Sequence, residues 1–275
     1  QLLAMSSTVN TTLHFIGMKG DTEFYKNMGF AINVYNSFTF IVVINLSMGL
    51  NAAASQALGT SNTRLVGMSL YKALLVHTFI NGSIYLFFYR NCAPILTAIG
   101  FDVVAAAESQ KFLSACYFLI MFTMLTETLK GYLFALQQFY PPVIVQCIIA
   151  VFHWFFCHFF IQESDLGYLG IVIAWTLSQA VGFCILLAYC LYVKPRGACF
   201  WIKPTREALE GILPFSKVMV GVAMMGYLEM VIYKVAAFEA AFLPGSQFAA
   251  VVSFYALDDL FYILPIGVSI PFTSY

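Results

Sequence analysis

The feature that most constrains this chain is a succession of long apolar segments. Seven of them contain 20 residues or more, at 27–58, 65–89, 109–133, 142–161, 167–193, 212–238 and 247–271, and a shorter, semi-polar segment covers 1–15. A helix rises about 1.5 Å per residue, so about 20 apolar residues cross the ~30 Å hydrocarbon core of a bilayer. The segments are too long for strands and lack a two-residue alternation of polar and apolar positions. The sequence therefore predicts an all-α polytopic membrane protein.

The composition supports this fold class and excludes several functions. Hydrophobic residues make up 61% of the chain and charged residues only 9%, whereas a soluble domain carries roughly 25% charged residues. The formal net charge is zero, so no basic field is present to hold nucleic acid. Nothing resembles a nucleotide-binding loop, a nucleophile triad or a metal cluster. We therefore predict neither an enzyme nor a bound cofactor.

The seven cysteines lie mostly inside the apolar segments. They form no C-x-x-C pair and no framework of loop cysteines, so we interpret them as small apolar packing residues. They are Cys92, Cys116, Cys147, Cys157, Cys184, Cys190 and Cys199.

The longest polar break in the chain is a basic stretch at 194–206, which reads KPRGACFWIKPTR. Short basic loops stay cytoplasmic, so this stretch predicts a cytoplasmic linker and places the acidic loop 162–165 outside. We expect an N-terminal lobe at 1–193, a linker at 194–206 and the start of a second lobe at 207–275. Shorter turn-like breaks fall at 59–62, 91–94, 141–142, 163–165 and 195–197.

Short motifs occur near the ends of these segments. Residues 49–59 read GLNAAASQALG, a glycine, an alanine run, Ser-Gln and a closing glycine. Others are HFIG at 14–17, GYLFALQ at 131–137 followed by Pro141, DLGYLG at 165–170, LPF at 213–215, LEMVIYK at 228–234 and LPIG at 264–267. In their order and spacing, over nearly the whole chain, they resemble the motifs of eukaryotic members of the MATE (multidrug and toxic compound extrusion) family.

This resemblance implies a fold and a function. The family fold has two six-helix lobes around a central cavity, and this chain would supply the first lobe and the first two helices of the second. The implied activity is secondary active antiport, in which organic and often cationic compounds are exported in exchange for protons or sodium. The implied location is the plasma membrane or a vacuolar or vesicular membrane.

Acidic residues inside the apolar segments are the candidate coupling sites, because a buried charge costs at least ~2.5 kcal/mol near the bilayer centre and needs a reason. Glu229 matches the acidic residue of the M-E-W-W-x-Y-E stretch of eukaryotic members, and we expect it to bind the driving cation or the substrate. Asp258 and Asp259 are adjacent in the last segment, where one of them could join it. Lys234 stands where that stretch has its second acid, and this departure could disable a two-carboxylate site.

Other polar residues receive less specific roles. Four neutral side chains could line the cavity or join helices: Asn36, Asn51, Gln56 and Gln179. Glu127 lies three residues before Lys130, a spacing that predicts a surface ion pair. His153 and His158 are expected to pack among aromatic residues.

Two alternative functions remain open at this point. One is a related lipid-linked saccharide flippase, a class that usually has a strongly cationic cavity, for which Lys234 is the lone candidate. The other is a truncated membrane protein without transport activity. The chain shows no signal peptide at Gln1 and no polar tail before Tyr275, so both ends look cut.

Overall fold

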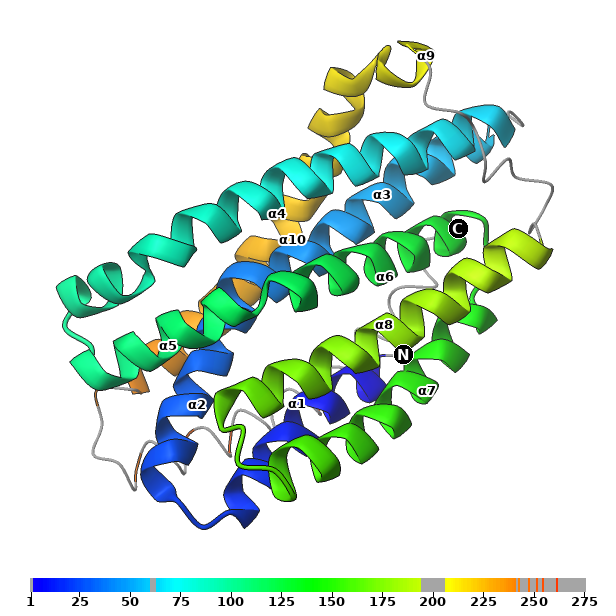
Figure 1. Ribbon diagram of the computed structural model, residues 1–275. Coiled ribbons are helices and arrows are strands. Elements are labelled where there is room, and N and C mark those ends of the chain that lie inside the picture. The colour runs from blue at the N-terminus through cyan, green and yellow to red at the C-terminus, as the bar shows by residue number, and fades with distance from the viewer. Residues whose placement is uncertain are drawn as a thin grey trace.

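The computed structural model describes residues 2–59, 63–193 and 206–240, and single residues 242, 247, 251, 254 and 261 beyond them. Every regular element within these residues is helical, which confirms the predicted fold class. Most of the helices run back and forth along one long axis (Figure 1). In order they are α1 (Leu2–Met18), α2 (Thr22–Tyr35), η1 (Asn36–Phe40), α3 (Ile41–Gly59), α4 (Thr63–Ile99), α5 (Val103–Ala115), α6 (Tyr117–Ala135), α7 (Tyr140–Cys157), η2 (His158–Gln162), α8 (Tyr168–Val193), α9 (Arg206–Leu209) and α10 (Ile212–Ala240).

Several helices begin where local chemistry favours a start. The side chain of Asp21 accepts hydrogen bonds from the backbone N–H groups of Glu23 and Phe24 at the beginning of α2, and Asp102 caps α5 in the same way. A capping carboxylate satisfies backbone donors that have no partner inside the helix. The predicted break at 141–142 lies in the first turn of α7, where proline is well tolerated.

The predicted break at 91–94 is wrong, because this stretch lies inside α4. Pro94 removes only one backbone donor, and it sits near the end of a long helix on an exposed side. The helix ends instead at Ile99, and the next residue, Gly100, has a φ of 105°, a conformation that favours glycine. The following segment consequently begins at Val103, with α5, rather than at residue 109.

The interior contains two apolar clusters with buried polar residues between them along the helices. One cluster contains Phe30, Phe112 and Trp175, and the other contains Leu50, Leu129 and Leu186. We call the polar residues between them the middle layer. Its members are Asn45 on α3, His77 and Asn81 on α4, Thr123, Thr126, Glu127 and Thr128 on α6, His153 on α7, and Ser178 and Gln179 on α8. All are buried, so the bundle is polar at mid-height.

The helix ends gather at two opposite ends of the molecule. Lys19, between α1 and α2, donates a hydrogen bond to the carbonyl of Ser164, between η2 and α8, at 2.8 Å. The breaks at 19–21 and 163–167 therefore share one end, as strict alternation of spanning segments requires. The basic stretch 194–205 lies outside the described residues, so the assignment of this end to the external side stays a prediction.

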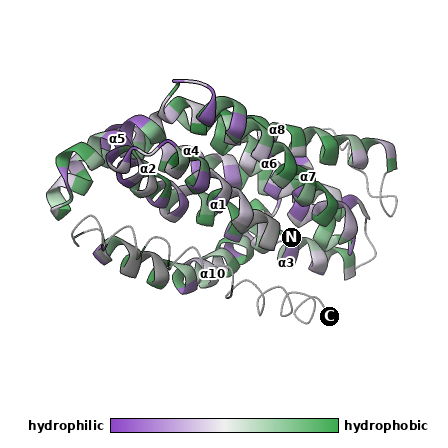
Figure 2. Ribbon diagram, turned by 90° about the horizontal axis from the view of Figure 1, so that it is seen from below, coloured by the Kyte–Doolittle hydropathy of each residue, from purple (hydrophilic) through white to green (hydrophobic). Residues whose placement is uncertain are grey.

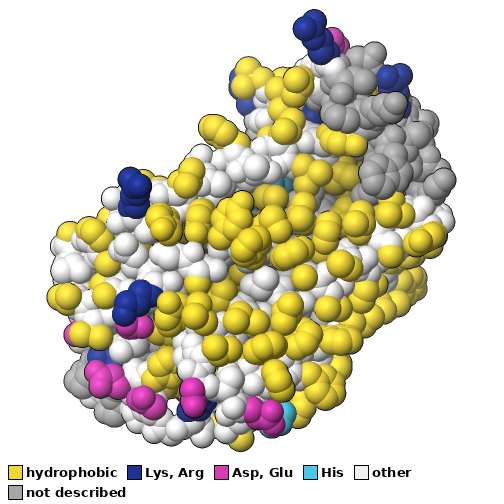
Figure 3. All heavy atoms as spheres, viewed as in Figure 1, with side chains coloured by type: hydrophobic (Ala, Val, Ile, Leu, Met, Phe, Trp, Pro, Cys, Tyr) yellow, Lys and Arg dark blue, Asp and Glu magenta, His cyan; other side chains and the backbone are white. Residues whose placement is uncertain are grey.

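The surface suits a bilayer. In Figure 3 hydrophobic side chains cover the middle of the visible face, and charged side chains gather towards its ends. Among the described residues, five spans are long and apolar enough to cross a membrane: Thr22–Gly59, Tyr117–Ala135, Tyr140–Gln162, Tyr168–Val193 and Ile212–Ile232. The expected segment at 65–89 is not among them. It is long enough, but α4 carries Lys72, His77 and Asn81 within its apolar part.

The last long described helix, α10, packs along α3. Figure 2 shows α10 at one edge of the assembly, away from α6, α7 and α8. The division into lobes at 193 and 206 stays a prediction, and the eighth segment, at 247–271, lies almost wholly outside the described residues.

Candidate functional site

The approach of α10 to α3 is very close, because two glycines remove the side chains that would separate the helices. A Cβ added at Gly49 would lie 2.1 Å from the carbonyl oxygen of Met219, and one added at Gly226 would lie 2.1 Å from Oδ1 of Asn45. Residue 45 is level with 226 and residue 49 with 219, so the helices run antiparallel. Small residues at such crossings let membrane helices pack backbone to backbone.

Glu229 lies three residues after Gly226 on α10, so it points about 60° away from the glycine around the helix axis. Met219 and Ala223 are buried on the side that faces α3, whereas Glu229 is exposed. Its carboxylate is therefore at the flank of the α3–α10 contact, where the side chain is exposed among the described residues. It is the single acid within the apolar span Ile212–Ile232.

The other charged candidates cannot be placed beside Glu229. Asp258 and Asp259 lie outside the described residues. Lys234 belongs to α10, but its side chain is likewise outside the described part of the chain. Whether these three groups share a site with Glu229 stays a prediction.

The four neutral candidates fall into two environments. Asn36 and Gln179 lie inside the bundle, and each has a buried side-chain oxygen without a hydrogen-bond partner among the described residues. Asn51 accepts a bond of 3.3 Å from Ser55 on α3, and Gln56, on the same helix, is exposed. The side-chain oxygens of Asn36 and Gln179 are therefore available to bind a polar group inside the bundle. Asn51 and Gln56 lie instead on the surface of α3 and could bind a polar group there.

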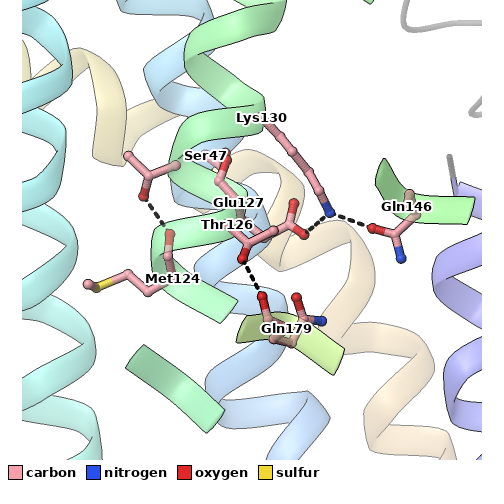
Figure 4. A network of polar contacts seen from close by, with 8 residues as sticks. Ser47, Met124, Thr126, Glu127, Lys130, Gln146 and Gln179 are labelled. Carbon is pink, nitrogen blue, oxygen red and sulfur yellow. Dashed lines mark hydrogen bonds and ion pairs between the residues drawn. The ribbon is translucent and has the colours of Figure 1, made fainter. Parts of the chain in front are cut away.

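A buried charge pair is the main feature that sequence reasoning missed. Lys130 donates a hydrogen bond of 2.6 Å to Glu127, and their side chains are only 1% and 5% exposed. The prediction of a surface ion pair is therefore wrong. The ammonium also donates to the side-chain oxygen of Gln146 on α7, and Figure 4 shows it between the two oxygens. Each charge thus has a partner, as a buried charge requires.

Neighbouring contacts tie this pair to the helices on either side. The hydroxyl of Ser47 on α3 donates to the backbone carbonyl of Glu127, and that of Thr126 donates to the carbonyl of Gln179 on α8 at 3.2 Å. A Cβ added at Gly131 would lie 2.6 Å from the carbonyl oxygen of Ser47. Within two turns, α6 thus forms hydrogen bonds to three neighbouring helices, α3, α7 and α8.

An exposed pair with the same spacing shows what the sequence pattern alone means. Lys111 lies 2.7 Å from Glu108 on α5, with side chains 58% and 27% exposed. The hydrogen bond to Glu108 raises the pKa of Lys111 above its ordinary value. The spacing is identical in the two pairs, so only the surroundings of the helix distinguish them. The hydroxyl residues Thr126 and Thr128 on either side of Glu127 were the signal in the sequence that could have indicated a buried polar environment.

His153 forms a second buried polar centre. Its Nε2 lies 2.9 Å from the hydroxyl of Thr12 on α1, and its Nδ1 lies 3.1 Å from the hydroxyl of Ser178 on α8. The ring also stacks on Trp175. The expected packing role among aromatic residues is present, and the two hydroxyl contacts add a polar connection between three helices.

The comparisons with known proteins give consistent results. A family model described as MatE matches residues 5–159, which is more than half of the chain. Protein DETOXIFICATION 16 from Arabidopsis thaliana is 22% identical over 245 residues, which are 87% of this chain and 50% of that protein. Multidrug and toxin extrusion protein 1 from Xenopus tropicalis is 24% identical over 262 residues, 93% of this chain and 44% of that protein.

The fold comparison points the same way. The crystal structure of the eukaryotic MATE transporter AtDTX14 superposes with a TM-score of 0.80 at 20% identity, covering 94% of this chain and 59% of that one. The chain thus spans about half the length of the curated relatives it matches.

Proposed function

The chain belongs to the MatE family, and from this premise we propose that it forms part of a secondary antiporter. The protein would export organic, often cationic, compounds in exchange for protons or sodium ions. The described helices would form the first lobe and the opening of the second. The family assignment and the apolar spans make the protein a multi-pass integral membrane protein.

The names of the relatives support export as the activity. One is called a detoxification protein and another a multidrug and toxin extrusion protein. Because the chain covers about half of each, we carry their activity over as a proposal about the full-length protein.

The observation that carries the proposal is the position of Glu229. It is the single acidic residue of the described apolar span Ile212–Ile232, and it is exposed at the flank of the α3–α10 contact. A carboxylate at this depth is costly unless a cation or another partner compensates it. We infer that a cation that binds and leaves during each cycle is one of its partners, and the exposure of Glu229 within the described part of the chain gives that cation access.

Exchange at this carboxylate would couple the two fluxes. When the site faces the cytoplasm, a cationic substrate displaces the driving cation. When it faces outside, the higher external concentration of that cation displaces the substrate. The two ligands compete for one charge, so each lowers the affinity for the other and no separate energy source is needed. Asp258 or Asp259 would assist by adding a second negative charge.

The buried charges weigh against the flippase alternative. A diphosphate headgroup needs cations that are free to bind it, and the buried Lys130 is already bonded to Glu127 and Gln146. Within the described lobe, therefore, the buried polar residues offer neutral groups rather than a cationic cavity.

The test uses the full-length protein in everted membrane vesicles. Glu229→Gln keeps the size of the side chain and its hydrogen bonding but removes the charge. We expect efflux of a fluorescent organic cation, driven by a proton or sodium gradient, to fall at least about tenfold while membrane insertion stays normal. Glu239→Gln, an exposed acid at the end of the same helix, is the matched control and should transport normally. Efflux at the wild-type rate by Glu229→Gln would remove this residue from the mechanism.

A further inference from the structure

A continuous series of contacts links α7 to α10 through α6 and α3. At one end, Gln146 on α7 accepts a hydrogen bond from Lys130 on α6. At the other end, α3 contacts α10 at two places. Asn45 contacts Gly226, and Gly49 contacts Met219. The buried pair of Glu127 and Lys130 on α6 is thus separated by one helix, α3, from α10, which carries Glu229.

The middle of this series is Ser47. Its hydroxyl donates to the backbone carbonyl of Glu127, while Asn45 and Gly49, two residues to either side, contact α10. Residues two positions apart on a helix point about 160° away from each other. One side of α3 is therefore fixed by α6 while the opposite side meets α10, so a rotation or shift of α6 would displace the surface against which α10 packs.

The charges give α6 a fixed orientation. The bond between Lys130 on α6 and Gln146 on α7 constrains the rotation of α6 relative to α7, because losing it would leave a buried polar group without a partner. Gly131 adds a steric condition, since it contacts the backbone of Ser47 at a distance that excludes any side chain.

We propose that Glu127 and Lys130 form a positioning unit, which holds α3 through Ser47 and thereby sets the place of α10 and Glu229. This assignment rests on the proposed antiport function. The pair is not itself the exchanging site, because protonation of Glu127 would leave the ammonium of Lys130 buried without its counter-charge. The unit acts through neighbouring helices and touches neither cation nor substrate.

The test measures the α3–α10 contact directly, by a disulfide between Asn45→Cys and Gly226→Cys in an otherwise cysteine-free, full-length protein. A Cβ at position 226 lies 3.1 Å from Cγ of Asn45, close to where the sulfur of a cysteine at 45 would lie, so a disulfide can form with little movement. The rate of oxidation, read on a gel, reports how well the two helices are held together.

The main variant adds Glu127→Leu and Lys130→Leu together. It leaves no uncompensated charge, and apolar replacement of a buried pair is often tolerated without loss of stability. We expect a monodisperse protein in which cross-linking slows about tenfold. Ser47→Ala, which removes the bond to α6 without touching a charge, should slow it about threefold. The Ser47→Ala result decides the question if the double variant does not fold.

Two matched controls separate positioning from general damage. The double replacement of Glu108 and Lys111 by leucine removes the exposed pair of identical spacing. Thr128→Ala removes a buried hydroxyl that, among the described residues, donates within α6 to the carbonyl of Met124. Both should cross-link at the unmodified rate. If Ser47→Ala and the folded double variant also cross-link at that rate, the positioning role is overturned.

A second readout uses efflux in vesicles as a function of pH. In the double leucine variant the maximal rate should fall, while the pH at half-maximal efflux stays within about 0.3 units of the unmodified protein, because the exchanging carboxylate is unchanged. A shift of about one unit or more would make Glu127 a coupling residue and contradict the proposal. If the unmodified protein shows no efflux, the antiport function fails, and the cross-linking rates still decide the positioning role.

Discussion

Gly226 of α10 lies so close to Asn45 of α3 that an added Cβ would be 2.1 Å from the amide oxygen of that side chain. One turn of α3 further on, a Cβ added at Gly49 would lie at the same distance, 2.1 Å, from the carbonyl oxygen of Met219. The two contacts differ in what must yield. At Gly226 the obstacle is the end of a side chain, which can rotate, whereas at Gly49 it is the backbone of the neighbouring helix.

This difference predicts unequal effects of two similar substitutions. Gly49→Ala must push α10 away and should cost about 1–3 kcal/mol, whereas Gly226→Ala should cost less because Asn45 can turn. Gly221→Ala is the control, since nothing lies within 4 Å of a Cβ added there. Thermal unfolding midpoints in detergent should fall in the order Gly221→Ala, Gly226→Ala, Gly49→Ala, from highest to lowest. An equal midpoint for all three would mean that the close approach is absent.

The contacts of His153 on α7 predict how much this side chain contributes to holding α1 against the bundle. Its ring contacts the hydroxyls of Thr12 and Ser178, so His153→Leu removes a polar connection between α1, α7 and α8. We expect a loss of about 1–3 kcal/mol, measured as a lower unfolding midpoint in detergent.

The nearby His158 is the matched control for this substitution. Its side chain is 49% exposed and lies 3.4 Å from the exposed Glu163, so His158→Leu should change the stability by less than about 1 kcal/mol. Equal losses for the two variants would contradict a specific role of the buried ring.

The orientation in the membrane is predicted by the basic stretch 194–206 and is testable at its edge. Arg206 is exposed at the start of α9, and Asp165 is exposed at the opposite end of the bundle. Single cysteines at these positions, in a cysteine-free background, should react differently with an impermeant reagent added to intact cells. Asp165→Cys should be labelled and Arg206→Cys should be protected. The reverse pattern would invert the assigned topology.

The sequence predicted those features that depend on local composition and motif order. Long apolar runs are sufficient for spanning helices, and the polar break at 163–165 ends η2 as expected. The family resemblance was confirmed because it rested on several motifs in order. The break at 91–94 was wrong because proline and asparagine favour turns only statistically, and a helix can continue past Pro94 when few residues remain before it ends.

The burial of Glu127 and Lys130 could not be predicted from their spacing. An ion pair three residues apart looks the same on a central helix and on a peripheral one, as Glu108 and Lys111 show. What decides is the number of helices around α6, and that is a property of the tertiary arrangement. The surroundings of Glu229 are predictable only in part for a related reason: Asp258 and Asp259, the residues that the sequence suggests as its neighbours, lie outside the described residues.

The central claim is that Glu229 holds the cation that the substrate displaces. The most direct measurement is cation release when an organic cation is added to the purified full-length protein, with protons followed by a pH indicator in weak buffer and sodium by an ion-selective electrode. We expect about one cation released per substrate bound in the unmodified protein and in Glu239→Gln, and none in Glu229→Gln. Release of the same amount by Glu229→Gln would contradict the account.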